Sequence, residues 1–250
     1  MLETRNLSKN FSGFQAINKV SFLLEKGTRH AIIGPNGAGK TTFFNLITGH
    51  LEPTEGEVLF EGRSLVGMPP HRIVKLGIAR SFQRINIYPR MTVAENVQVA
   101  LIARDGRHLN LFTPAEGLNG KETDELLQLV GLTQERDEIA GELAYGRQKQ
   151  LELAISLAPN PKVLLLDEPT AGMSPTETTE SIQLVDRISK ERDLTLLFTE
   201  HDMSVVFGIA DRITVLHHGE IIASGSPEEV RNDPNVRSVY LGDSLEDATA

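Results

Sequence analysis

Residues 34–42 read GPNGAGKTT, and this stretch decides the fold of the chain. It fits the phosphate-binding pattern G-x-x-x-x-G-K-[ST], whose fixed positions are filled by Gly34, Gly39, Lys40 and Thr41. The alternative is a chance glycine turn, which would fit the pattern but would not be expected to have a strand before it and a helix after it. Here the apolar run HAII precedes the loop and predicts a buried strand, and TFFNLIT follows it with the apolar spacing of a helix. Strand, glycine-rich turn and helix together predict a phosphate-binding loop.

The residue types in this loop suit phosphate. Glycines allow backbone N–H groups to turn toward phosphate oxygens, and the N-terminus of the next helix adds a positive dipole end. We expect Lys40 to reach the β- and γ-phosphates of a nucleotide and the Thr41 hydroxyl to hold Mg²⁺. The predicted loop contacts are Gly34, Pro35, Asn36, Gly37, Ala38, Gly39, Lys40, Thr41 and Thr42.

A second motif is the run KVLLLDE at 162–168, in which large apolar residues end in two acids. This pattern predicts a buried parallel strand with carboxylates at its C-terminal edge, where open α/β sheets bind ligands. Asp167 is expected to coordinate Mg²⁺, directly or through water. Glu168 is expected to orient or deprotonate the water that attacks the γ-phosphate. A surface Asp-Glu pair that caps the next segment is the alternative.

Two further candidates follow predicted strands of the same sheet. The run TLLFT at 195–199 is followed by His201, which would hydrogen-bond the γ-phosphate, although a lone histidine is more often structural. The run GIARSF at 77–82 is followed by Gln83, which would touch Mg²⁺ or the attacking water. On position alone, a solvated loop glutamine is the more frequent interpretation of Gln83.

Two weaker signals lie outside these strands. Phe11 either stacks on a nucleobase or is an ordinary core aromatic, and its spacing favours neither. Residues 143–147, LAYGR, precede a helix predicted over 148–158 and form a possible anion site, with an ordinary helix cap as the alternative. Residues 2–27 predict short strands, and residues 212–216 and 220–223 predict a hairpin.

Composition limits the classes of protein that fit. A chain of 250 residues holds one large α/β core and a smaller subdomain. It has no cysteine, which suits a reducing cytosol, and no apolar run near the roughly 18 residues of a membrane span. We do not expect the first residues, MLETR, to form a signal peptide. The net charge of −9 argues against a nucleic-acid partner, since phosphate backbones require clustered Lys and Arg.

Together these motifs resemble the ATP-binding cassette (ABC) family, the nucleotide-hydrolysing subunits of membrane transporters, over nearly the whole chain. GPNGAGKTT is similar to the Walker A motif, and VLLLDE to the Walker B motif with Glu168 as catalytic glutamate. Gln83 lies at the Q-loop position and His201 at the switch-histidine position. The resemblance implies ATP and Mg²⁺ as ligands, Glu168, His201 and Gln83 as catalytic residues, and Thr41, Gln83 and Asp167 around the metal.

The resemblance also bears on the weaker signals. Phe11 falls where the family has its adenine-stacking aromatic. Residues 171–174 occupy the D-loop position. LAYGR occupies the signature position, which implies that Ala144, Tyr145, Gly146 and Arg147 meet the ATP of a second cassette. Three departures from the family pattern bear on the strength of these trans contacts: Ala144 replaces the usual serine, Arg147 the usual glutamine and Ser174 the usual aspartate. Loss of the serine hydroxyl removes one hydrogen bond to the γ-phosphate, and Arg147 either compensates by electrostatics or faces solvent.

The fold implied by the resemblance is α/β. It has a P-loop NTPase (RecA-like) core with a mainly parallel sheet, an N-terminal antiparallel β subdomain and an inserted helical subdomain. We expect a single domain over 1–250, with the core and β subdomain in 1–82 and 159–241. The helical subdomain is expected over 83–158, and residues 242–250 are expected to be a frayed tail.

Within the family, the segments GIARSFQ, MTVAENV and DEPTAGMSP look most like cassettes of branched-chain or hydrophobic amino acid importers. Importers of urea or amides share these features. The implied partners are a second cassette in a homo- or heterodimer, transmembrane permease subunits and a solute-binding protein. The implied location is the cytoplasmic face of the cell membrane, as a peripheral subunit.

Other classes stay open at this level. A cassette that powers lipid or lipopolysaccharide export shares the same ATPase chemistry. A soluble P-loop kinase also needs the loop, Mg²⁺ and an acid, but leaves the signature-like helix and His201 without a role. A soluble cassette acting on ribosomes or DNA fits a single cassette of negative charge poorly.

Overall fold

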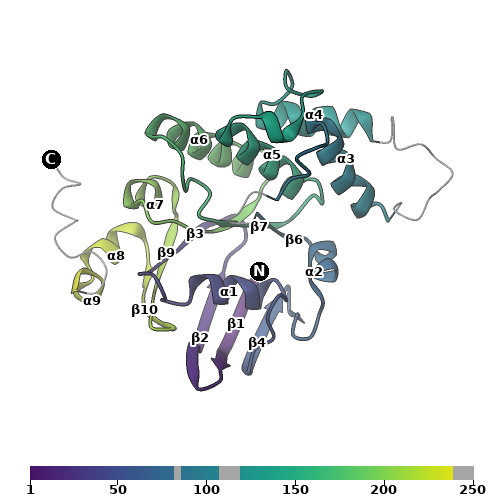
Figure 1. Ribbon diagram of the computed structural model, residues 1–250. Coiled ribbons are helices and arrows are strands. Elements are labelled where there is room, and N and C mark those ends of the chain that lie inside the picture. The colour runs from purple at the N-terminus through teal and green to yellow at the C-terminus, as the bar shows by residue number, and fades with distance from the viewer. Residues whose placement is uncertain (82–85, 107–118, 239–250) are drawn as a thin grey trace.

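Two β-sheets and a group of helices make up the computed structural model, which describes residues 1–81, 86–106 and 119–238 (Figure 1). In the view of Figure 1 the antiparallel sheet lies at the bottom and the longer helices, which fall within residues 93–191, lie at the top, with the larger sheet between them. Gln83 and the predicted tail 242–250 lie outside the described residues. Within the described ranges, no helix is long and apolar enough to cross a membrane.

The larger sheet has six strands in the order β10-β9-β3-β8-β7-β6. All neighbours in it are parallel except the hairpin of β9 and β10, as predicted from the sequence. The strands are β3 (Arg29–Ile33), β6 (Ile78–Arg80), β7 (Val163–Asp167), β8 (Thr195–Thr199), β9 (Arg212–His217) and β10 (Glu220–Gly225). Because β3, β8 and β7 are adjacent and parallel, the segments that follow them meet at one edge of the sheet.

The smaller sheet is antiparallel, in the order β2-β1-β4-β5. Its strands are β1 (Leu2–Phe11), β2 (Phe14–Leu24), β4 (Glu55–Phe60) and β5 (Arg63–Ser64). The prediction of short strands over 2–27 was wrong, since β1 and β2 have 10 and 11 residues. The only tight turn between them is Ser12-Gly13, where both residues have positive φ, 46° and 96°. Bulges bend both strands without ending them.

Helix α1 (Lys40–Ile47) packs between the two sheets. Its apolar side chains Phe43, Phe44, Leu46 and Ile47 are all buried. They contribute to one core cluster that includes residues of both sheets, such as Leu7 of β1 and Leu165 of β7. This burial fixes the glycine-rich loop before α1 against the rest of the molecule.

A second core cluster lies on the other side of the six-stranded sheet, under the helices inserted between β6 and β7. These are α3 (Val93–Arg104), α4 (Gly120–Val130), the short 3₁₀ helix η2 (Ala140–Glu142) and α5 (Tyr145–Leu157). Gly131 ends α4 with φ 80°, a left-handed conformation that glycine adopts readily at helix C-termini. Helix α5 begins three residues earlier than predicted, because Ala144 is extended and Tyr145 already has helical geometry.

The remaining helices are α2 (Pro70–Leu76), α6 (Pro175–Glu191), α7 (Met203–Ile209), α8 (Pro227–Asn232) and α9 (Pro234–Val236). Ser174, at the predicted D-loop, is the N-cap of α6 and forms a capping box with Glu177. The Ser174 hydroxyl is thereby engaged within its own helix end. The subdomain boundaries at 82/83 and 158/159 stay predictions.

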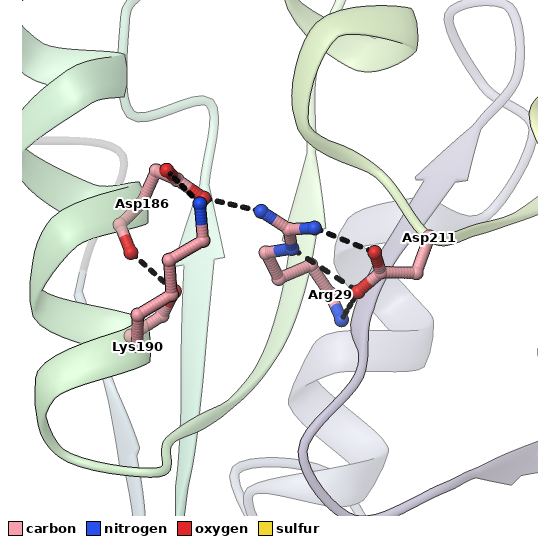
Figure 2. A network of polar contacts seen from close by, with 5 residues as sticks. Arg29, Asp186, Lys190 and Asp211 are labelled. Atoms are coloured by element: carbon pink, nitrogen blue, oxygen red, sulfur yellow. Dashed lines mark hydrogen bonds and ion pairs between the residues drawn. The ribbon is translucent and has the colours of Figure 1, made fainter.

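A charge network ties α6 to the edge of the sheet where the parallel strands begin. Arg29, the first residue of β3, donates through Nη2 to Asp211 Oδ1 at 2.6 Å and through Nη1 to Asp186 on α6 (Figure 2). Lys190 donates to the other oxygen of Asp186 at 2.7 Å. Each acid of the network therefore has a cationic partner.

Candidate functional site

The glycine-rich loop is pressed so closely between neighbouring strands that two of its glycines accept no side chain. A Cβ atom on Gly34 would lie 2.1 Å from the carbonyl oxygen of Leu216 on β9. Gly39 has φ 106°, and a Cβ there would lie 2.6 Å from the carbonyl oxygen of Ala16 on β2. The fixed glycines of the motif are therefore required by packing as well as by phosphate geometry.

The turn of the β9–β10 hairpin braces the same loop. The backbone N–H of Gly219 donates to the Ala38 carbonyl at 3.0 Å, and the Gly219 carbonyl accepts from Asn18 N–H at 2.9 Å. A Cβ on Gly219 would lie 2.7 Å from the Ala16 carbonyl oxygen. The sequence predicted the hairpin but contained no signal for this contact, which joins segments almost 200 residues apart.

The N-terminus of α1 presents an anion site. No side chain caps this helix, whose N-cap is Gly39, so its first-turn N–H groups face outward without a side-chain acceptor. The Lys40 ammonium folds back over the loop and donates to the Gly34 and Pro35 carbonyls at 2.6 and 3.2 Å. Burial lowers the pKa of Lys40, and the carboxylates of Glu168 and Asp167 offset part of that shift. Phosphate oxygens would offer this cation charged acceptors in place of two neutral carbonyls.

A cavity of about 330 Å³ opens over this helix end. Its lining is formed by Phe14, Ala16, Asn36, Gly37, Ala38, Gly39, Lys40, Thr41, Thr42 and Glu168. The loop and Glu168 therefore face the same space, as predicted from two motifs that are far apart in the sequence. Thr41 is exposed in this cavity, so its hydroxyl is accessible to a ligand.

The aromatic side chain at this cavity is Phe14, a residue that the sequence reasoning did not select. Its side chain lines the cavity and is 66% exposed. Phe11 is paired with Phe14 across the β1–β2 turn and is 41% exposed, with Lys9 Nζ lying 5.2 Å from its ring centroid. Phe11 is not buried in the core, and this exposure excludes its interpretation as an ordinary core aromatic. Its role as a stacking residue stays a prediction.

Asp167 is the last residue of β7 and is almost completely buried, with 3% exposure. The Thr199 hydroxyl donates to Oδ1 at 2.9 Å, and Arg80 Nη2 donates to Oδ2 at 2.7 Å. Sequence reasoning did not identify Arg80, because arginine at the end of a short strand has no motif of its own. Its position next to β7 follows only from the pairing of β6 with β7.

Glu168 has left-handed backbone geometry, with φ 51°. Such a conformation costs of order 1 kcal/mol or more for a non-glycine residue and is concentrated at functional sites. The Glu168 N–H donates to the Thr199 carbonyl at 3.1 Å, which holds the strained residue against β8. The strain turns the carboxylate out of the sheet and into the cavity.

His201 meets Glu168 at the sheet edge, with 2.8 Å between Nε2 and Oε1. The histidine side chain is 45% exposed and the glutamate side chain 17%, so the pair opens toward solvent. The neighbouring Glu200 is buried and accepts hydrogen bonds from the Thr170 N–H and hydroxyl at 2.9 and 2.6 Å. Glu200 also accepts from the His201 N–H at 3.1 Å and thereby fixes the loops that carry both residues of the pair.

The signature-position residues do not line this cavity. Ala144 is the N-cap of α5 and gives no side-chain cap, and the Tyr145 hydroxyl donates to the Ala171 carbonyl at 3.1 Å. Arg147 donates to the Gly131 carbonyl at 3.1 Å and pairs with Glu135 at 3.3 Å. Gly146 shares the first turn of α5. The contact of Ala144, Tyr145, Gly146 and Arg147 with a nucleotide stays a prediction that requires a second chain.

The site suits Mg²⁺ that arrives with phosphate. Across residues 1–81, 86–106 and 119–238, no group of three or more His, Cys, Asp or Glu side chains could hold a metal. Mg²⁺ typically takes one or two carboxylates or hydroxyls, keeps several waters and completes its shell with substrate phosphates. Thr41 and Asp167 fit that donor set. The third predicted metal contact, Gln83, falls in the part of the chain that the structure does not describe.

Comparison with known proteins points in the same direction. Residues 17–171 match the family model described as ABC transporter, and residues 220–246 match the model described as branched-chain amino acid ATP-binding cassette transporter. The chain is 40% identical to the high-affinity branched-chain amino acid transport ATP-binding protein BraF of Pseudomonas aeruginosa, covering 98% of both chains. It is 39% identical to LivG of Escherichia coli, which has the same description, again covering 98% of both. It is 31% identical to the lipopolysaccharide export system ATP-binding protein LptB of Haemophilus influenzae.

Solved structures agree with these sequence relatives. The ADP conformation of an ATP-binding cassette of an ABC transporter has a TM-score of 0.86 and 34% identity, covering 97% of this chain and 98% of that one. A dimeric cassette in a post-hydrolysis state, bound to ADP and Pi, has a TM-score of 0.77 and 26% identity, covering 91% and 99%. The predicted fold class is confirmed by these neighbours.

Proposed function

The chain belongs to the ABC transporter family, and we propose that it is the ATP-binding and ATP-hydrolysing subunit of a transporter that imports branched-chain or other hydrophobic amino acids. One observation carries the ATPase part of this proposal. The anion site at the start of α1 and Glu168, which His201 contacts at 2.8 Å, lie on one cavity at the same edge of the sheet. The import part rests on the names of relatives that match over nearly their whole length and on the match of residues 220–246.

The residues have distinct roles in this mechanism. The loop from Gly34 to Thr42 binds the β- and γ-phosphates through backbone N–H groups, and Lys40 moves from its two carbonyl acceptors to the phosphate oxygens. Thr41 and Asp167 would hold Mg²⁺, which would supply electrostatic stabilisation of the phosphate charge. Glu168 orients and deprotonates the attacking water, and His201 holds Glu168 in place and contacts the γ-phosphate.

The signature-position residues act on a different nucleotide. Ala144 to Arg147 lie at the start of α5, outside the cavity that holds the loop and Glu168. We infer a head-to-tail dimer in which this segment faces the ATP of the second cassette, so that two nucleotides lie in a two-fold interface. A dimeric cassette with ADP and Pi is among the solved structures that this chain resembles. The permease subunits, a solute-binding protein and a peripheral position at the cytoplasmic face of the membrane belong to the same proposal.

The export and kinase alternatives differ from import in what stimulates hydrolysis. In proteoliposomes that contain the cassette with its permease subunits and solute-binding protein, we expect leucine to stimulate ATP hydrolysis and to accumulate on the trans side. A Glu168→Gln variant should abolish accumulation. Stimulation by lipopolysaccharide and not by leucine would favour export. ADP formation that requires an added acceptor in place of water would favour a kinase.

A further inference from the structure

Beneath the predicted metal position lies an arginine that pairs directly with the predicted metal ligand. Arg80 Nη2 lies 2.7 Å from Asp167 Oδ2, and the two side chains are only 8% and 3% exposed. The pair is therefore shielded from solvent, and its charges interact more strongly than those of a surface ion pair. The Asp167 carboxylate is therefore balanced from within the protein by the Arg80 guanidinium.

The guanidinium is held in this place from a second side. Arg80 Nη1 donates to Asn45 Oδ1 at 2.7 Å, and the guanidinium carbon lies 5.5 Å from the centroid of the Phe44 ring. Asn45 and Phe44 belong to α1, the helix whose first turn carries Thr41. One arginine at the end of β6 thus links the helix of the phosphate-binding loop to the strand that ends in Asp167.

The position of this charge affects how a metal ion can enter. A divalent cation at Asp167 would lie close to the fixed positive charge of Arg80, and Lys40, which is near enough to interact with the charge of Asp167, adds a second cation. A triphosphate brings several negative charges and reverses this balance. Without it, the repulsion opposes metal binding at a carboxylate that is already paired.

We propose that Arg80 suppresses metal binding by the nucleotide-free protein, so that the metal enters this site together with the triphosphate. The proposal rests on the proposed function, in which Asp167 is a metal contact. It adds Arg80 as a positioning residue that acts through Asp167 and touches neither metal nor nucleotide. It also predicts an order of binding, because binding of the free metal before the nucleotide is disfavoured.

The test measures Mn²⁺ binding to the full chain without nucleotide, from the electron paramagnetic resonance signal of free Mn²⁺. We expect Arg80→Gln to bind Mn²⁺ at least about tenfold more tightly than the wild type, because one nearby positive charge is removed. Arg80→Lys keeps the charge and should stay within about threefold of the wild type. Arg231→Gln is the matched control and should leave Mn²⁺ binding unchanged, because the Arg231 guanidinium lies 4.8 Å from the centroid of the Phe207 ring rather than against a carboxylate.

Two further variants localise the effect. Adding Asp167→Asn to Arg80→Gln should remove the gained Mn²⁺ affinity, because the site then lacks its carboxylate. Asn45→Ala frees the guanidinium on one side without a change of charge and should raise Mn²⁺ affinity by a smaller factor, about two- to fivefold. It also keeps the test available if Arg80→Gln does not fold, which circular dichroism and thermal unfolding will show.

The proposal is overturned if folded Arg80→Gln binds Mn²⁺ as the wild type does, or if Arg231→Gln shows an equal gain. A gain that survives Asp167→Asn also overturns it. If Arg80→Gln does not fold, the proposal is overturned when Asn45→Ala binds Mn²⁺ with the same affinity as the wild type. Failure of the proposed function has a separate signature, because the wild type would then neither bind nor hydrolyse MgATP.

Discussion

The two edges of the six-stranded sheet both carry clusters of charge, but the clusters differ in how their charges are balanced. At the edge where the strands begin, Arg29 is shared between Asp211 and Asp186, and Lys190 pairs with Asp186 (Figure 2). At the edge where the strands end, Lys40 donates to neutral carbonyls, and Glu168 faces a cavity on strained backbone. The first cluster is complete within the protein, whereas the second is arranged to receive a charged ligand.

The pKa directions reflect the same contrast. The hydrogen bond that Arg29 donates to Asp211, with the charges of both acids, outweighs burial and raises the pKa of Arg29. Hydrogen bonding to Lys190 is the main reason why the pKa of Asp186 is lowered. At the other edge burial lowers the pKa of Lys40, which means that its charged form is less well stabilised. A functional edge can therefore be distinguished from a structural edge by how well its charges are compensated.

The largest expected effect at the functional edge comes from Glu168→Gln. If Glu168 is the general base, ATP hydrolysis should fall by roughly 10²–10⁴-fold while ATP binding is retained. Calorimetric titration with MgATP and a phosphate-release assay measure the two quantities. Lys40→Ala is the complementary variant and should lose tight ATP binding. Wild-type turnover in Glu168→Gln would remove Glu168 from this role.

A second prediction concerns His30, which lies within β3 between the two edges. Its Nε2 lies 2.8 Å from the Thr214 hydroxyl, and burial lowers the pKa of His30 to about 4. The unfolded chain has the ordinary value near 6.5, so between about pH 6.5 and 4 it binds a proton that the folded protein does not. The free energy of unfolding should therefore fall as the pH falls through this window, by at most about 3 kcal/mol.

Urea unfolding at pH 7 and pH 4.5 measures this loss. In His30→Asn the contribution of His30 disappears, so the difference between the two pH values should shrink relative to the wild type. Replacement of the exposed His218 by Asn is the matched control. An equal pH dependence in the wild type and His30→Asn would contradict the assignment to His30.

A third prediction separates the two aromatic side chains near the cavity. Phe14→Ala should weaken ATP binding by about 2- to 12-fold if the ring stacks on the base, with a smaller loss for triphosphate lacking a base. Phe11→Ala is its matched partner, because both are exposed phenylalanines of the same turn. Titration calorimetry of both variants decides which ring contacts the nucleotide. A loss of ATP affinity confined to Phe11→Ala would support Phe11 as the adenine-stacking residue, which is the role that the family resemblance implies.

The smallest effect is expected at the structural edge. Arg29→Gln breaks the ion pairs with Asp211 and Asp186, but these side chains are partly exposed, so the loss of stability should be about 1 kcal/mol. Steady-state ATP hydrolysis should not change, because the network lies at the opposite edge from Glu168. Thermal unfolding measures the loss of stability, and the ATPase assay measures the rate of hydrolysis. A large loss of activity in folded Arg29→Gln would break the distinction between the edges.

Local sequence was sufficient where a motif and its neighbours in the chain carry the information. The glycine pattern, Lys40 and the apolar runs before and after them predicted the loop between β3 and α1. The run that ends in Asp167 and Glu168 predicted a buried strand at the ligand-binding edge, and the structure has it as β7. The family and fold class predicted from these motifs are both confirmed.

Contacts between segments that are distant in the sequence could not be predicted from local motifs. Arg80 and Glu200 carry no motif, and their importance arises from the neighbours that strand order gives them, Asp167 for one and Thr170 for the other. The choice between Phe11 and Phe14 as the cavity-lining side chain depends on how the β1–β2 hairpin is placed over the loop. The length of that hairpin was also missed, because bulges within its strands resemble turns in sequence.

What the sequence determined by itself is which groups are candidates for the chemistry: a glycine-rich loop with its lysine, two acids at the end of a buried strand and a histidine after the next strand. These follow from residue type and spacing, because strands and helices form from neighbouring residues. Only the tertiary structure decided that His201 lies 2.8 Å from Glu168, that Arg80 neutralises Asp167 and that the β9–β10 turn braces the loop. The physical reason is that these contacts depend on the order β9-β3-β8-β7-β6, which is set by packing of the whole core rather than by any one segment.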